Sequence, residues 1–294
     1  MNMKLAVEWF LNPDHLPIII AKEKGFLKEG GIDAFEIIVP TEHYDGLQDL
    51  IDGNIEFATN EPLHLIEQYH EEFLSLGTYF ETKGGVMMKK EALEKLIRGE
   101  NIKLVTPVSN DKTNRIGFEI IKRYCEKKGI NVSPEQVEFC AEDFYLIKHL
   151  KSGYDAAWLY FYNFEGVESK YEEDLDIVFM DTETAGFANF CALDIFTTHT
   201  FYNENKSLVE GFIKAIKKAI DFIDEHPEEA QQIYYGYAKE EPSKLTDEIL
   251  TETSKCFRKD FESSAERELP ILEFFNEIGI TDLPEEKFRK AFIN

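Results

Sequence analysis

Aromatic, amide and imidazole side chains that can contact a small aromatic molecule occur close together near the start of the sequence. Trp9 ends an apolar strand pattern, a polar turn follows at Asn12, and His15 comes shortly before an apolar helix pattern. In open α/β sheets, a strand followed by a turn and a helix start presents a ligand site at the carboxyl end of the strand. We therefore expect Trp9, Asn12 and His15 to share one lip of a ligand crevice. The alternative is that Trp9 belongs to the core and His15 is an ordinary residue near a helix cap.

An aromatic-rich loop that contains one carboxylate follows the strand pattern at residues 154–159. Tyr160, Tyr162 and Asn163 precede Glu165 in this loop. Such a loop suits a flat heteroaromatic ring with an amidine edge, because a carboxylate can accept charge-assisted hydrogen bonds from an exocyclic amine and a protonated ring nitrogen. We expect these four residues to contribute to the site. The alternative is that Glu165 is one solvated acid among 57 acidic residues.

Two further strand-to-helix junctions carry polar residues of interest. Asn60 and His64 lie at the first junction, and Ser109 and Asn110 lie at the second. Ser109 and Asn110 can cap a helix, and the exposed N–H groups of a helix start can bind an anion or a formyl oxygen. The simpler alternatives are a plain N-cap and a partly buried histidine with satisfied hydrogen bonds. The sequence contains no Ser-His-Asp order, zinc signature, Walker pattern or dinucleotide fingerprint.

The elements that must position these residues alternate between strand and helix along most of the chain, which predicts an α/β architecture. A short helix is predicted over residues 44–51, and the pattern is mainly helical from residue 203 onward. At 294 residues the chain is long enough for two lobes with separate cores. We expect lobe one at residues 1–85, lobe two at residues 86–197 and a mostly helical return to lobe one at residues 198–294. A chain that leaves a lobe and returns predicts a ligand cleft between the lobes.

The stretch from Glu8 to His15, together with the stretch from Ala21 to Asp33, resembles the opening of a known superfamily. Its members are the thiamine-pyrimidine synthases and the solute-binding proteins that deliver formylated aminopyrimidine to an ABC importer. The resemblance extends to about Glu229, and the importer-linked members have a run similar to residues 162–165. It implies a two-lobed, type-II periplasmic-binding-protein-like fold with an aminopyrimidine ligand of the formylaminopyrimidine or hydroxymethylpyrimidine type.

Two features of the synthases differ in this sequence. The synthase lysine that holds pyridoxal phosphate aligns with Asn60, and the synthase histidine proposed as a substrate aligns with His64. The cysteine-rich run of the synthases matches only at Phe190 and Cys191. Asparagine cannot form a Schiff base, so we expect a binding protein without a cofactor. The alternatives are a hydroxymethylpyrimidine phosphate synthase that uses histidine, pyridoxal phosphate and iron, and a solute-binding protein for another small molecule.

Composition excludes several classes of partner. The formal net charge of −25 argues against nucleic acid and anionic membrane surfaces. The four cysteines are far apart and show no metal-binding spacing. No transmembrane run or signal peptide is present, so the expected location is the cytoplasm, or outside it for a trimmed mature form. The expected partners are a small aminopyrimidine and, for an exported form, an ABC permease. Whether the chain forms a homodimer is left open by the sequence.

Overall fold

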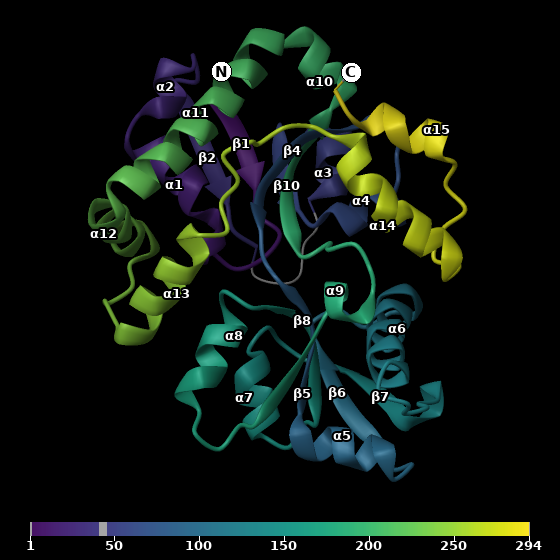
Figure 1. Cartoon of the computed structure of the whole chain (residues 1–294). Coiled ribbons are helices and arrows are strands. Elements are labelled where there is room, and N and C mark those ends of the chain that lie inside the picture. The colour runs from purple at the N-terminus through teal and green to yellow at the C-terminus, as the bar shows by residue number, and fades with distance from the viewer. Residues whose placement is uncertain (1, 41–45, 294) are drawn as a thin grey trace. The chain divides into compact units, whose positions relative to one another are not determined.

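The computed structural model describes residues 2–40 and 46–293, and the chain divides into two compact units (Figure 1). Unit 1 comprises residues 1–81, 192–276 and 281–294, and unit 2 comprises residues 82–191 and 277–280. Each unit contains one five-stranded sheet with helices, so the predicted α/β class is confirmed. The predicted lobe boundaries at residues 85 and 197 lie a few residues beyond the observed ones at 81 and 191, and at the second boundary the reason is that the strand that returns the chain to unit 1 already begins at Ala192.

The sheet of unit 1 has the strand order β2-β1-β3-β10-β4. Its strands are β1 (Asn2–Ala6), β2 (Ala34–Ile38), β3 (Phe57–Asn60), β4 (Phe73–Glu81) and β10 (Ala192–Thr198). β1 is parallel to β2 and β3, whereas β10 is antiparallel to both β3 and β4. The carboxyl ends of β1, β3 and β4 and the amino end of β10 therefore lie at one edge of the sheet.

The helices of unit 1 come from both ends of the sequence. The early helices are α1 (Leu16–Glu23), α2 (Phe26–Glu29), α3 (Leu47–Ile51) and α4 (Pro62–Glu67). The later helices are α10 (His199–Glu204), α11 (Lys206–Glu225), α12 (Pro227–Ala238), α13 (Lys244–Ser254), α14 (Ala265–Glu277, with Glu277 assigned to unit 2) and α15 (Glu285–Phe288). α11 buries Val209, Phe212 and Ile216 at helical spacing, as expected for an amphipathic helix. The helix predicted over residues 44–51 corresponds to α3, and its predicted first residues lie outside the described part.

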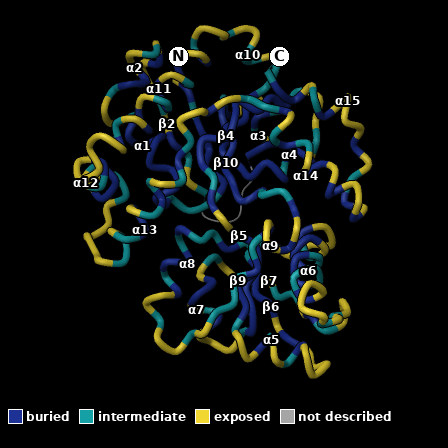
Figure 2. The backbone as a smooth tube through the Cα atoms, in the orientation of Figure 1, coloured by how far each residue is buried: buried dark blue, intermediate teal, exposed yellow. Residues whose placement is uncertain are grey.

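Aromatic packing joins the early and late segments of unit 1. Phe57 of β3 stacks on Phe212 of α11, with ring centroids 4.2 Å apart and an interplanar angle of 10°. Phe35 of β2 also stacks on Phe212, at 5.8 Å. Such pairs contribute roughly 0.5–1.5 kcal/mol each beyond area burial. The strands are mostly buried while the outer turns of the helices are exposed, as Figure 2 shows.

Unit 2 has a second mixed sheet, with the strand order β7-β6-β8-β5-β9. Its strands are β5 (Gly84–Lys89), β6 (Ile102–Thr106), β7 (Val137–Ala141), β8 (Ala156–Phe161) and β9 (Ile177–Asp181). Its helices are α5 (Lys90–Ile97), α6 (Asp111–Glu126), α7 (Leu146–Lys151), α8 (Glu165–Glu168) and α9 (Thr182–Ala185). Part of its core is a buried cluster that includes Met87, Val105, Leu146 and Tyr160.

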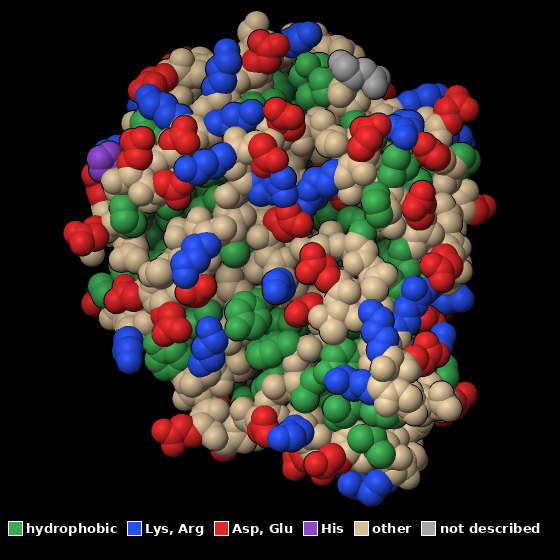
Figure 3. All heavy atoms as spheres, viewed as in Figure 1, with side chains coloured by type: hydrophobic (Ala, Val, Ile, Leu, Met, Phe, Trp, Pro, Cys, Tyr) green, Lys and Arg blue, Asp and Glu red, His purple; other side chains and the backbone are tan. Residues whose placement is uncertain are grey.

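Charged side chains of both signs are interspersed over the face seen in Figure 3, although acidic residues outnumber basic ones. A mixed distribution of this kind favours solubility. Within residues 2–40 and 46–293, no helix has the length and apolar content that crossing a membrane requires.

One close backbone contact in unit 1 generates a stability prediction. Gly30, after α2, lies against Gly211 of α11, and a Cβ atom at Gly30 would lie 2.6 Å from the carbonyl oxygen of Gly211. A Cβ atom at Gly211 would likewise overlap the backbone of Gly30. We expect Gly211→Ala to lower the free energy of unfolding by about 1–3 kcal/mol through overpacking, as measured by denaturant titration.

Gly236 of α12 is the matched control, because no atom lies within 4 Å of the Cβ position there. Gly236→Ala should leave stability unchanged or raise it by up to about 1 kcal/mol, since alanine favours a helix over glycine. Equal effects of the two substitutions would contradict the assigned packing of α2 on α11.

Candidate functional site

The turn after β1 is built around Asn12. Its side-chain oxygen accepts a hydrogen bond from the backbone N–H of Asp14 at 2.8 Å. Its own backbone N–H donates to Nδ1 of His15 at 3.3 Å, which completes a capping box around the short 3-10 helix Pro13–His15. This reciprocal capping explains the polar turn that the sequence predicts at Asn12. Trp9 is half-buried beside this turn, and its ring centroid lies 6.4 Å from that of Phe10.

A buried hydrogen-bonded set ties this turn to the neighbouring strand β3. Nε2 of His15 lies 3.1 Å from one carboxylate oxygen of Glu8, and the hydroxyl of Thr59 donates to the other at 2.5 Å. All three residues are buried. Burial alone would raise the pKa of Glu8, but the contact with His15 and the hydrogen bond from Thr59 hold it below the usual 4.5. The ring of His15 is therefore used inside unit 1 to support Glu8.

The end of β3 brings a second pair of predicted residues to the same sheet edge. Asn60 is fully buried, and its side-chain oxygen accepts from the backbone N–H of Glu61 at 3.0 Å. His64, on α4, lies between two carboxylates: Nε2 is 3.5 Å from Glu61 and Nδ1 is 3.4 Å from Glu67. Burial raises the pKa of Glu61 to about 7, with His64 opposing this shift and Glu8 adding to it.

The structure thus places Asn12, His15, Asn60 and His64 at one edge of the unit 1 sheet. Sequence reasoning missed the acids that accompany them, of which Glu8 and Glu61 are the clearest cases. The available signal was a carboxylate directly after each of two apolar strand patterns, since Glu8 follows β1 and Glu61 follows β3. We call Glu8, His15, Thr59, Asn60, Glu61 and His64 the acidic edge of unit 1.

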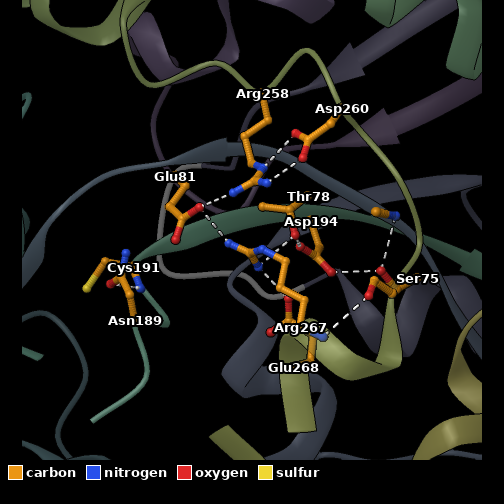
Figure 4. A network of polar contacts seen from close by, with 12 residues as sticks. Ser75, Thr78, Glu81, Asn189, Cys191, Asp194, Arg258, Asp260, Arg267 and Glu268 are labelled. Carbon is orange, nitrogen blue, oxygen red and sulfur yellow. Dashed lines mark hydrogen bonds and ion pairs between the residues drawn. The ribbon is translucent and has the colours of Figure 1, made fainter. Parts of the chain in front are cut away.

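A second polar network lies beside the acidic edge, on β4, β10 and the C-terminal segment (Figure 4). Asp194 is the ladder partner of Asn60 and accepts hydrogen bonds from Ser75 at 2.7 Å and Thr78 at 2.5 Å. Arg267 donates to Thr78 at 2.9 Å and pairs with both Glu81 and Glu268. Arg258 also pairs with Glu81, so two guanidinium groups hold the end of β4.

Burial raises the pKa of Glu268 to about 8, and the charge of Asp194 adds to this effect while Arg267 opposes it. Burial raises the pKa of Asp194 as well, so both acids hold a proton more strongly than usual while Arg267 opposes the shift in each. None of the residues named in this network was predicted from the sequence as a site residue, because they come from three segments that are far apart in the chain.

Four predicted residues of unit 2 lie at the end of β8 and in the loop after it, because β8 extends to Phe161 and so includes Tyr160. Glu165 is buried, and one of its carboxylate oxygens accepts from the backbone N–H of Phe161 at 2.9 Å. Tyr160 lies in the core, with its hydroxyl bonded to Asp181, whereas Tyr162 packs against Phe179 and remains partly exposed. Asn163 is also buried. The loop is as aromatic as predicted, but Tyr160 and Glu165 both take part in its internal packing.

Asn110 is the N-cap of α6. Its side-chain oxygen accepts from the backbone N–H groups of Lys112 and Thr113, at 3.0 and 2.9 Å. Ser109 instead bonds to the side chain of Asn114. The predicted capping role explains why this helix begins at Asp111, but both residues are solvent-exposed and the anion site proposed there stays a prediction.

Within the described part of the chain, no group of three or more His, Cys, Asp or Glu side chains is arranged to hold a metal ion. The four cysteines are free thiols, and Cys125 and Cys191 are buried.

Comparisons with known proteins identify relatives over most of the chain. The profile of the family described as NMT1/THI5 like matches residues 12–230. A Haemophilus influenzae protein named for thiamine biosynthesis is 24% identical over 95% of this chain and 88% of its own length. The 4-amino-5-hydroxymethyl-2-methylpyrimidine phosphate synthase of Aspergillus parasiticus is 20% identical over 96% of this chain and 84% of its own length.

Solved structures support the fold predicted from the sequence. The alkanesulfonate-binding protein SsuA of Xanthomonas axonopodis has a TM-score of 0.70 at 9% identity, with 99% of this chain and 98% of that chain covered. A Candida albicans protein described as having the generic periplasmic binding protein fold has a TM-score of 0.66 at 14% identity, covering 100% and 96%. The ligand-binding component of an ABC-type import system from Staphylococcus aureus has a TM-score of 0.67 at 11% identity, covering 99% of each chain. The periplasmic-binding-protein-like fold is thereby confirmed.

The contact between Glu8 and His15 generates a test of the acidic edge. We expect Glu8→Leu and His15→Leu each to lower the free energy of unfolding by about 3–5 kcal/mol, because either change leaves a buried polar partner behind. The double variant should lose clearly less than the sum of the two, since neither partner is then stranded. Denaturant titration of the three variants and the wild type measures this coupling. Additive losses would show that the two side chains do not support each other.

Proposed function

Because this chain belongs to the NMT1/THI5 like family, we propose that it binds a thiamine-precursor aminopyrimidine for thiamine biosynthesis or salvage. The ligand would be of the hydroxymethylpyrimidine or formylaminopyrimidine type. The observation that carries the proposal is the acidic edge, where buried acceptors gather at the ends of β1 and β3, and the half-buried Trp9 directly follows one of them, Glu8, in the sequence. Acceptors suit the amine of the ligand, and an aromatic ring can stack on the pyrimidine, which contributes about 1–3 kcal/mol by analogy with base stacking.

A second candidate function is synthesis of hydroxymethylpyrimidine phosphate from histidine and pyridoxal phosphate. The names of the Aspergillus parasiticus and Legionella pneumophila relatives favour it, as does His64 held between Glu61 and Glu67. The residue at the expected Schiff-base position opposes it, because Asn60 is fully buried and an amide nitrogen does not condense with an aldehyde. The residues here do not fit covalently held pyridoxal phosphate, and binding without catalysis is the function we favour.

Transport is the setting that the structural neighbours suggest. The Staphylococcus aureus neighbour is described as the ligand-binding component of an ABC-type import system. For an exported form of this chain, an ABC permease would be the partner, and for a cytoplasmic form the protein would retain or deliver the pyrimidine inside the cell. No cofactor is required in either case.

Ligand identity is tested by thermal unfolding of ligand-free protein. We expect 4-amino-5-hydroxymethyl-2-methylpyrimidine, or its 5-formylaminomethyl analogue, to raise the melting temperature. Binding to the native state alone stabilises it by about 2.7 kcal/mol at a hundredfold excess over Kd. MOPS, which occupies the Xanthomonas axonopodis neighbour, serves as the comparison ligand. Stabilisation by MOPS and not by any aminopyrimidine at millimolar concentration would overturn the proposal in favour of another solute.

The synthase alternative has its own readout. Incubation with stoichiometric pyridoxal phosphate should produce no adduct beyond those on exposed lysines, because Asn60 replaces the lysine of the synthases. A stoichiometric adduct on one buried residue of unit 1 would favour the enzyme.

Glu165 is tested by measuring affinity and stability on one variant. If Glu165 accepts from the amidine edge, Glu165→Gln should weaken binding by about 2–4 kcal/mol, roughly thirtyfold to a thousandfold in Kd. If Glu165 only accepts from the N–H of Phe161, the variant should lose stability while Kd holds. Calorimetric titration and thermal unfolding separate the two outcomes. Glu173→Gln is the control, because Glu173 is exposed on the same unit.

A further inference from the structure

Glu61 is a buried acid whose side chain has no role in starting its helix. It occupies the N-cap position of α4, yet its carboxylate makes no capping hydrogen bond. The carboxylate instead lies 3.5 Å from Nε2 of His64, and the side chain is 11% exposed to solvent. Buried carboxylic acids are costly, so an acid at this position is expected to serve a purpose other than stability.

Charged groups face Glu61 from several elements. His64 and Glu67 lie on its own helix, and Glu8 comes from the end of β1. Burial is the main cause that raises the pKa of Glu61 to about 7, and Glu8 and Glu67 add to it while His64 opposes it. The acid therefore changes its charge close to neutral pH.

A buried donor lies in the same surroundings. Tyr79 of β4 is fully buried, and within the described part of the chain its hydroxyl has no hydrogen-bond partner. Burial raises its pKa, and the negative charges of Glu8, Asp14, Glu61 and Asp194 raise it further. Buried hydroxyl groups are nearly always hydrogen-bonded. Tyr79 therefore places an unbonded hydroxyl in the electrostatic surroundings of Glu8 and Glu61.

We propose that Glu61 is the residue of unit 1 that reads the ring nitrogen of the bound aminopyrimidine, an inference that rests on the proposed function. A 4-aminopyrimidine presents an amine donor beside a ring nitrogen with a lone pair. The protonated acid can donate its hydrogen to that nitrogen, or the carboxylate can accept from the protonated ring. In both forms the complex holds one proton between the Glu61 oxygen and the ring nitrogen, and no other bond changes.

This sharing of one proton predicts how affinity depends on pH. Above pH 7 the free protein has an ionised Glu61 and the free ligand is neutral, so binding must take up one proton. The Kd of wild type should therefore rise with pH between 7 and 9, approaching tenfold per pH unit. In Glu61→Gln the amide does not titrate, so this slope should vanish, and at pH 7 the Kd should be about tenfold to a hundredfold higher than that of wild type.

The effect of Glu61→Gln on stability should be opposite to its effect on affinity. A raised pKa means that the native state holds a proton that the unfolded state has lost, so this acid reduces stability progressively as pH rises from 4.5 to about 7. Glu61→Gln should therefore raise the melting temperature of ligand-free protein at pH 8 and change it little near pH 4.5. A purely structural acid would instead show a lower melting temperature in the variant.

Glu168→Gln is the matched control. Burial and the charge of Glu172 raise the pKa of Glu168 to about 7, but this residue lies on α8 of unit 2. Its variant should also gain stability at pH 8, with the Kd and its pH slope unchanged. The stability effect of removing a buried acid is thereby separated from the loss of ligand contact.

The decisive experiment is calorimetric titration with 4-amino-5-hydroxymethyl-2-methylpyrimidine at pH 7, 8 and 9, in two buffers of different ionisation enthalpy. Uptake of up to one proton by wild type at pH 8, lost in Glu61→Gln, supports the inference. Tight binding by wild type with no proton uptake would overturn it while leaving the proposed function intact, and this result requires no variant to fold. Absence of binding by wild type would overturn the proposed function itself.

Discussion

The hydrogen bonds that Glu8 accepts inside unit 1 are the constraint on which the rest of the acidic edge depends. His15 approaches one carboxylate oxygen from the turn after β1, and Thr59 donates to the other from β3. A buried carboxylate is stable only when such partners are in place. Glu8 therefore fixes the turn that carries Asn12 relative to the strand that carries Asn60. The positions of Glu61 and His64 follow, because both lie within one helical turn of that strand end.

Local features of this region were predictable from the sequence, and long-range features were not. The polar turn at Asn12 and the cap at Asn110 depend on residues a few positions away, so short patterns were sufficient to find them. The charge state of Glu61 depends on burial and on Glu8, which is far away in the sequence. The internal contact of Glu165 was missed for a different reason, because its hydrogen bond to Phe161 is local but depends on the loop conformation, which residue types alone do not determine. Hydrophobic periodicity identifies an element, but it does not tell which acid the element buries.

The C-terminal segment of unit 1 lies beyond the part of the chain that matches the family. The family match ends at residue 230, whereas Arg258 and Arg267, which hold Glu81 and the region around Asp194, lie beyond it. The backbone continues the same association, since the carbonyl oxygen of Cys256 accepts from the N–H of Glu81. The C-terminal segment is thus an integral part of the unit that carries the acidic edge.

The antiparallel insertion of β10 has a consequence for the biosynthesis of the chain. β10 lies between β3 and β4, so β4 cannot join the sheet of unit 1 until residues 192–198 have left the ribosome. Unit 2, in contrast, takes nearly all of its residues from the continuous segment 82–191. Domains generally fold as units during synthesis, so unit 2 can fold before the sheet of unit 1 is complete. Until β10 has emerged, the unpaired edges of β3 and β4 are exposed to chaperones and to other nascent chains.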